Sequence, residues 1–112
     1  MDLVISTRHG EISDRQKREV QEQFERLGRY EPRISRVSVT LTDEGDRWEV
    51  EAHASVDRGD AVHAHGEGGD PRSAVDAAAD RLGRQLRRQR DRHTDHQAPG
   101  AGSTPPGAGD RG

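Results

Sequence analysis

Six arginines lie within twelve residues near the C-terminal end of the sequence, over residues 81–92. An arginine side chain is always charged, and its planar guanidinium can bind two oxygen atoms of one phosphate. Arg81, Arg84 and Arg88 share one face of a helix because of their spacing, and Arg92 extends that face. The pattern favours a basic helical face that binds phosphate groups. The alternative is a charged face that contacts only water, which is common for runs of charge. The flanking arginines are Arg87 and Arg90.

The helix that carries these arginines is predicted to begin at residues 70–71. Asp70 can accept backbone N–H bonds as the N-cap, and Pro71 suits the first helical position. An apolar stripe follows at helical spacing and ends at Leu86, whereas the arginines continue to Arg92. We therefore expect the end of this helix to project beyond its domain. The stripe consists of Val75, Ala78, Ala79, Leu82 and Leu86.

A second helix is predicted near the N-terminus, beginning after Ser13. Ser13 and Gln16 have the spacing of a capping box. Val20, Phe24 and Leu27 form a narrow apolar stripe, and the outer face mixes both signs of charge because three glutamates dilute its basic residues. Taken alone, the outer face of this helix is best interpreted as a solvent-exposed surface with salt bridges. Its candidate RNA-binding residues are Arg15, Lys17, Arg18, Arg26 and Arg29.

Four strands are predicted from alternating apolar and polar residues, over 2–8, 34–42, 47–56 and the segment from Val62. A tight loop over 57–59, with Gly59 in the left-handed conformation, joins the last two. The element order is β-α-β-β-β-α. Each helix has one apolar stripe and each strand one apolar face, so we expect an α+β two-layer sandwich, with a four-stranded sheet and both helices on one face.

Three histidines fall on the last two predicted strands and are candidate metal ligands. In the expected register His53 lies opposite His63, and Glu51 opposite His65, on the solvent face. Imidazole and carboxylate groups ligate zinc, but the spacing of these residues matches no zinc motif. A site on the solvent face would also lack buried groups that hold the ligands in place. We predict no metal site and no cofactor.

Composition narrows the function classes further. Residues 43–70 hold nine acidic residues and two arginines, whereas residues 81–92 hold six arginines and one aspartate. This division suggests an oriented contact with an anionic partner.

The chain has no cysteine, and its sequence shows no signal peptide or membrane-length apolar run, so we expect a cytoplasmic protein. The sequence contains neither a nucleophile-elbow motif nor a phosphate-binding glycine loop, so we expect that the protein is not an enzyme. Residues 1–96 should form one domain and residues 97–112 a disordered Gly/Pro-rich tail.

Several of these residues together resemble the ribosome hibernation promoting factor and ribosome-associated inhibitor family. The similarity covers residues 1 to about 95 and is most specific in the second helix. The matching positions there are Asp70, Ala74-Val75-Asp76, Arg81-Leu82, Gln85-Leu86, Arg88 and Arg90. Supporting matches are Leu3-Val4-Ile5, Arg8-His9, Glu25-Arg26-Leu27 and Val62-His63-Ala64.

The resemblance implies a domain shaped like double-stranded RNA-binding domains. It also implies binding to the small ribosomal subunit and its ribosomal RNA, in the channel for messenger and transfer RNA, through basic side chains of both helices. Such a protein inhibits translation or stores inactive ribosomes under stress. We expect a short form without a second domain, monomeric away from the ribosome, that binds neither DNA nor membranes. The first helix is less basic than is usual in the family, and lysine is nearly absent.

Two alternatives stay open at this point. The first is a general structured-RNA-binding domain of similar fold. The second is a metal-binding or protein-interaction domain that uses the exposed histidine face. Binding to purified small ribosomal subunits would separate the ribosome-binding interpretation from both alternatives.

Overall fold

The computed structural model describes the backbone of residues 1–97 and the side chains of residues 1–92. Except for Gln97, the predicted disordered tail lies outside the described residues. Among these residues, no helix is both long and apolar enough to cross a membrane. The elements in chain order are β1 (Asp2–Arg8), α1 (Asp14–Tyr30), β2 (Ile34–Asp43), β3 (Trp48–Val56), β4 (Val62–Gly68) and α2 (Pro71–Gln97).

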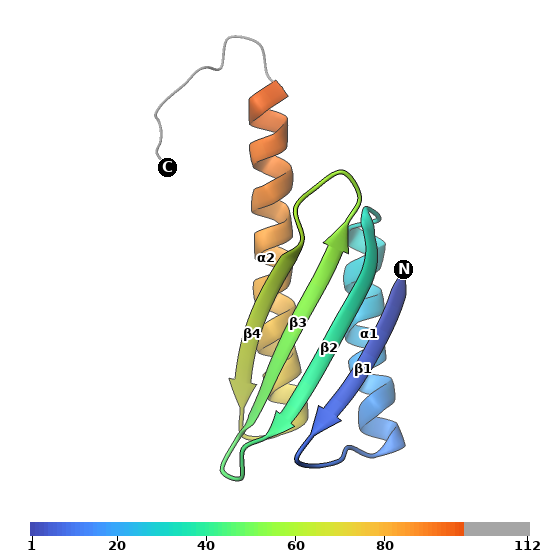
Figure 1. The fold of residues 1–112 in the computed structure, drawn as a ribbon, viewed down its shortest axis with the longest axis vertical. Coiled ribbons are helices and arrows are strands. Elements are labelled where there is room, and N and C mark those ends of the chain that lie inside the picture. Colours follow the sequence, from blue (N-terminus) through green and yellow to red (C-terminus); the bar gives the residue numbers. More distant parts are fainter. Residues whose placement is uncertain (98–112) are drawn as a thin grey trace.

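The four strands form one sheet in the order β1-β2-β3-β4. β1 runs parallel to β2, whereas the β2–β3 and β3–β4 pairs are antiparallel. Both helices cover the same face of this sheet, and the other face is open (Figure 1). These features confirm the predicted α+β fold with its β-α-β-β-β-α order.

The core lies between the sheet and the two helices. Pairing of Val39 with Ala52 and of Leu41 with Val50 places these side chains on the helix-covered face. From the helices, Phe24, Leu82 and Leu86 are fully buried against them. The predicted apolar stripes are thus confirmed, with Leu27 and Ala79 half-buried at the edge of the core.

Both predicted helix starts are confirmed by their hydrogen bonds. The Gln16 backbone N–H donates to Ser13 Oγ at 3.1 Å, and the Ser13 N–H donates to Gln16 Oε1 at 2.8 Å. At α2 the Ser73 N–H donates to Asp70 Oδ1 at 2.7 Å. This bond lowers the pKa of the Asp70 carboxyl, because it stabilises the charged form.

Gly66 allows β4 and α2 to approach each other closely. A Cβ atom at this position would lie 2.4 Å from the Ala78 backbone nitrogen and 2.5 Å from the Ala74 carbonyl oxygen. Those distances are too short for any side chain, so only glycine fits. β4 continues past Gly66 to Gly68, two residues before the Asp70 cap of α2.

The β3–β4 connection keeps the predicted register but not the predicted conformation. His53 pairs with His63 and Glu51 with His65, as expected. The left-handed residue is Arg58, with a φ of 60°, and not Gly59. A Cβ atom at Gly59 would lie 3.1 Å from the Gln89 side-chain oxygen, so the loop packs closely against α2 at this position.

Candidate nucleic-acid interface

α2 is much longer than the sheet that it covers. Leu86 is the last buried apolar residue among its described side chains, and the helix continues to Gln97. Figure 1 shows its C-terminal part extending past the β3–β4 loop and past the end of α1. The predicted projection of this helix is confirmed. All six arginines of residues 81–92 are exposed to solvent.

Three of the six arginines already bind groups of the domain. Arg81 Nη1 donates to the His65 carbonyl oxygen at 2.6 Å, on the edge strand β4. Arg84 pairs with Asp80 one turn earlier, at 2.7 Å. Arg90 Nη1 lies 2.7 Å from Glu31 Oε2 at the end of α1. The guanidinium groups of these three are at least partly engaged within the domain.

The other three arginines, Arg87, Arg88 and Arg92, differ in this respect. Within the described side chains, none of them forms an ion pair or a hydrogen bond to a side chain. Arg88 and Arg92 line an open groove of about 450 Å³ between α2 and the start of β4. We call Arg87, Arg88 and Arg92 the basic segment of α2. The lack of an ion-pair partner among the described side chains favours the binding of an anionic ligand here. The other residues that line the groove are Asp60, Ala61, Val62, His63, Gln85 and Gln89.

The five basic residues of α1 are also exposed, but acidic residues surround them. Arg15 lies 3.9 Å from Glu19, and the Arg26 guanidinium donates to Gln23 at 3.4 Å. Glu22 and Glu25 are exposed on the same helix. The positive potential of α1 is therefore weaker than that of the basic segment of α2. The exposed basic residues are Arg15, Lys17, Arg18, Arg26 and Arg29.

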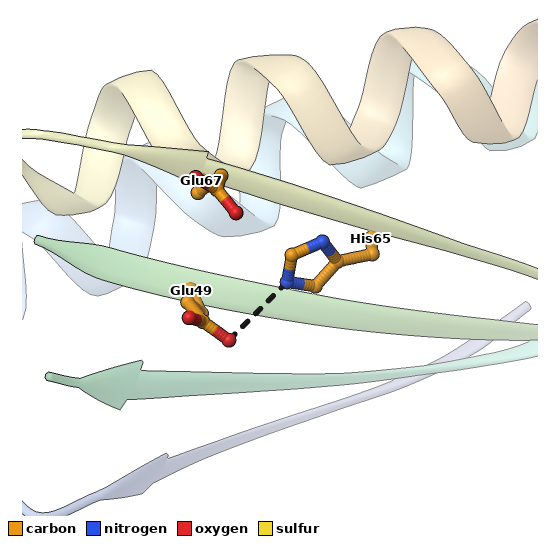
Figure 2. Close-up of side chains that lie close together, drawn as sticks. All are labelled: Glu49, His65 and Glu67. Carbon is orange, nitrogen blue, oxygen red and sulfur yellow. Dashed lines mark hydrogen bonds and ion pairs between the residues drawn. The ribbon is translucent and has the colours of Figure 1, made fainter.

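The open face of the sheet carries the histidines. The rings of His53 and His63 stack with their centroids 5.3 Å apart, as their cross-strand pairing requires. Figure 2 shows Glu49, His65 and Glu67 turned toward one another on this face, and their ligand atoms lie within 4.8 Å. Sequence reasoning had grouped His65 with Glu51 and missed the two other glutamates. The register could have found them, since Glu49 pairs with Glu67.

A cation already sits beside this carboxylate cluster. Arg47 Nη2 lies 2.7 Å from Glu49 Oε2, and its Nε lies 3.9 Å from Glu67 Oε1. His65 Nε2 approaches Glu49 Oε1 at 3.3 Å. The hydrogen bond from Arg47 and then that of His65 lower the pKa of Glu49, because both favour the carboxylate. Arg47 thus forms ion pairs with both carboxylates of the group. We call Arg47, Glu49, His65 and Glu67 the open-face cluster.

Comparison with known proteins links this architecture to ribosomes. Residues 3–94 match the family described as Sigma 54 modulation protein / S30EA ribosomal protein. The chain is 34% identical over 96 residues to the ribosome hibernation promoting factor of Salmonella typhimurium, covering 86% of this chain and 100% of that protein. The Escherichia coli K12 factor is 33% identical over the same coverage.

A longer relative and two solved structures complete the comparison. The ribosome hibernation promotion factor of Rhizobium meliloti is 31% identical over 97 residues, which is 86% of this chain but about half (51%) of that protein. The Thermus thermophilus Protein Y N-terminal domain superposes with a TM-score of 0.69 at 28% identity, covering 79% of this chain and 98% of that one. A ribosomal subunit interface protein from Coxiella burnetii has the same fold, with a TM-score of 0.75 at 19% identity, covering 81% and 99%.

Proposed function

The chain belongs to the Sigma 54 modulation protein / S30EA ribosomal protein family, and from this premise we propose that it is a ribosome-binding hibernation factor. Relatives that match it over their whole length are named ribosome hibernation promoting factors. In our proposal it binds the small subunit and its ribosomal RNA, occupies the channel for messenger and transfer RNA, and thereby inhibits translation or stores inactive ribosomes.

The observation that carries the binding mode is the basic segment of α2. Its three arginines are exposed on a helix that leaves the domain, and no described side chain neutralises them. Arginine forks bind phosphate oxygens, and phosphate contacts position a protein on RNA without reading the base sequence. Folded RNA is recognised largely through its shape and backbone, which suits a partner with one fixed surface.

Competition on purified small subunits tests this proposal. The full chain should sediment with the subunits in a sucrose gradient, and its affinity should fall steeply as salt rises, since binding releases counterions. Subunits that already hold messenger and transfer RNA should bind much less of it. Equal binding to empty and to filled subunits would contradict the channel as the binding site.

A general structured-RNA binder of the same fold is the competing function. Such a domain would bind an unrelated RNA duplex about as tightly as it binds the subunit, because it would read only helical shape and phosphates. An excess of duplex RNA should therefore leave the proposed ribosomal complex largely intact. If the duplex displaces the chain at equal concentration of phosphates, the general reading replaces ours.

A further inference from the structure

Among the described residues, Glu31 is the one charged residue in the buried interior, with 4% of its surface exposed. It is the C-cap residue of α1. The C-terminal end of a helix carries partial negative charge, so a buried carboxylate there is unfavourable unless cations compensate it. Two guanidinium groups do so. Arg33 Nη2 lies 3.5 Å from Glu31 Oε1, and Arg90 Nη1 lies 2.7 Å from Oε2.

The contact with Arg90 joins α1 to the part of α2 that leaves the core. Arg90 stands four residues beyond Leu86, where the buried apolar stripe ends. Its neighbour Gln89 donates to the Asp60 carbonyl oxygen at 2.8 Å, in the β3–β4 loop. Two polar contacts on different sides therefore hold α2 at this level. Because a helix is stiff over a turn or two, these contacts also set the direction of the basic segment around them.

Building on the proposed ribosomal function, we propose that Arg90 is a positioning residue and not an RNA contact. Held by Glu31, it fixes the basic segment of α2 relative to the basic residues at the end of α1, so that both meet one RNA surface. Moving its guanidinium to a phosphate would leave the buried Glu31 with Arg33 alone at 3.5 Å, which is strongly unfavourable. This assignment removes Arg90 from the sequence-predicted RNA-contacting set.

Salt dependence separates a positioning residue from a phosphate contact. We would measure the Kd of the full chain for purified small subunits over a series of salt concentrations, with melting curves for each variant. The matched control, Arg88→Gln, removes a charge of the basic segment and should lower the slope of log K against log salt by about 0.7 to 0.9. Arg90→Gln should raise the Kd by about threefold to tenfold at every salt concentration and leave the slope unchanged.

Glu31→Gln gives a test by sign. The change removes a negative charge and frees Arg90, so any account in which Arg90 contacts phosphate predicts tighter binding. Positioning predicts weaker binding, by about the same threefold to tenfold as for Arg90→Gln. A variant that carries both Glu31→Gln and Arg90→Gln should bind no worse than either single variant, because each change removes the same Glu31–Arg90 contact.

Two results would overturn the positioning role. One is a lower salt slope for Arg90→Gln, matching that of Arg88→Gln. The other is equal or tighter binding by a folded Glu31→Gln variant. If the melting curves show that Glu31→Gln does not fold, the Arg90→Gln slope decides, since Glu31 keeps Arg33 there and the Arg90 side chain is 48% exposed. A parent chain that does not bind, or an Arg88→Gln slope equal to that of the parent, overturns the proposed function instead.

Discussion

Two charged regions of this domain differ in how their charges are compensated. In the open-face cluster, Arg47 forms ion pairs with Glu49 and Glu67, and His65 Nε2 lies 3.3 Å from Glu49, so every charge has a partner within 4 Å. In the basic segment of α2, three arginines have no such partner among the described side chains. We therefore expect an anionic ligand to be attracted more strongly to the second region than to the first.

Charge density alone is therefore a poor guide to a binding surface. The open-face cluster holds carboxylates and an imidazole in a geometry that a metal ion could accept, yet Arg47 already forms ion pairs with both carboxylates. On α2, Arg81, Arg84 and Arg90 look equivalent to their neighbours in the sequence but bind the domain itself. Compensation, which depends on the fold, decides which charges remain for a partner.

The largest expected effect comes from reversing the uncompensated charges. Arg87→Glu with Arg88→Glu should abolish co-sedimentation with small subunits, a loss of at least about a hundredfold, because phosphate contacts become repulsion. The melting temperature should change little, since exposed side chains away from the core alter stability by only about 0.5 kcal/mol. Retained binding at moderate salt would remove the physical basis of the contrast between the two regions.

A smaller effect is expected on α1. Arg18→Glu with Arg29→Glu reverses as many charges, but Glu19, Glu22 and Glu25 already dilute that face. We expect a loss of about tenfold in affinity, measured in the same sedimentation assay. A loss as large as that of the α2 variant would mean that both helices contact phosphates equally.

The pH dependence of stability should report the compensated groups. The folded-state pKa values of Glu49 and Asp70 are lowered, by Arg47 and by the Ser73 N–H respectively. A lowered pKa means that the stabilisation is complete above the pKa of the unfolded chain and is lost as pH falls through the folded-state value. Melting curves between about pH 2 and 5 should therefore shift to lower temperature as acid is added. The shift should be smaller in Glu49→Gln, and an identical acid shift in that variant would contradict the role of Glu49.

The smallest effect is expected where both carboxylates of the open-face cluster are neutralised. Glu49→Gln with Glu67→Gln should leave the affinity for small subunits within about twofold, because this face lies away from the basic segment. Calorimetric titration of the parent chain with zinc should show no tight site. A stoichiometric zinc site that disappears in the double variant would instead make the open-face cluster a metal site.

Much of the fold was predictable because it depends on residues close in sequence. The capping box of Ser13 and Gln16, the Asp70 cap and the alternating strands are local patterns, and each is confirmed. The register of His53 opposite His63 followed from the loop length alone. The α2 stripe, and the arginines that continue past it, also showed correctly that the helix would project.

What escaped prediction depends on contacts between distant residues. Nothing near Glu31 in the sequence shows that it will be buried, because its partner Arg90 lies 59 residues away. The need for glycine at position 66 arises from the closeness of α2. Likewise, the spacing of the arginines alone could not show that Arg81 and Arg84 have partners within the domain.

The strand order has a consequence for how the chain folds. Because β1-β2-β3-β4 is also the order of synthesis, each strand pairs with the one made just before it, and no strand must be inserted later. The β2–β3 and β3–β4 partners are joined by short loops, which favours rapid pairing, whereas β1 and β2 are parallel and separated by α1. The Glu31–Arg90 contact joins residues 59 positions apart, so it can form only after most of α2 has been synthesised. In our proposal, the direction of the basic segment therefore depends on one of the last parts of the domain to be made.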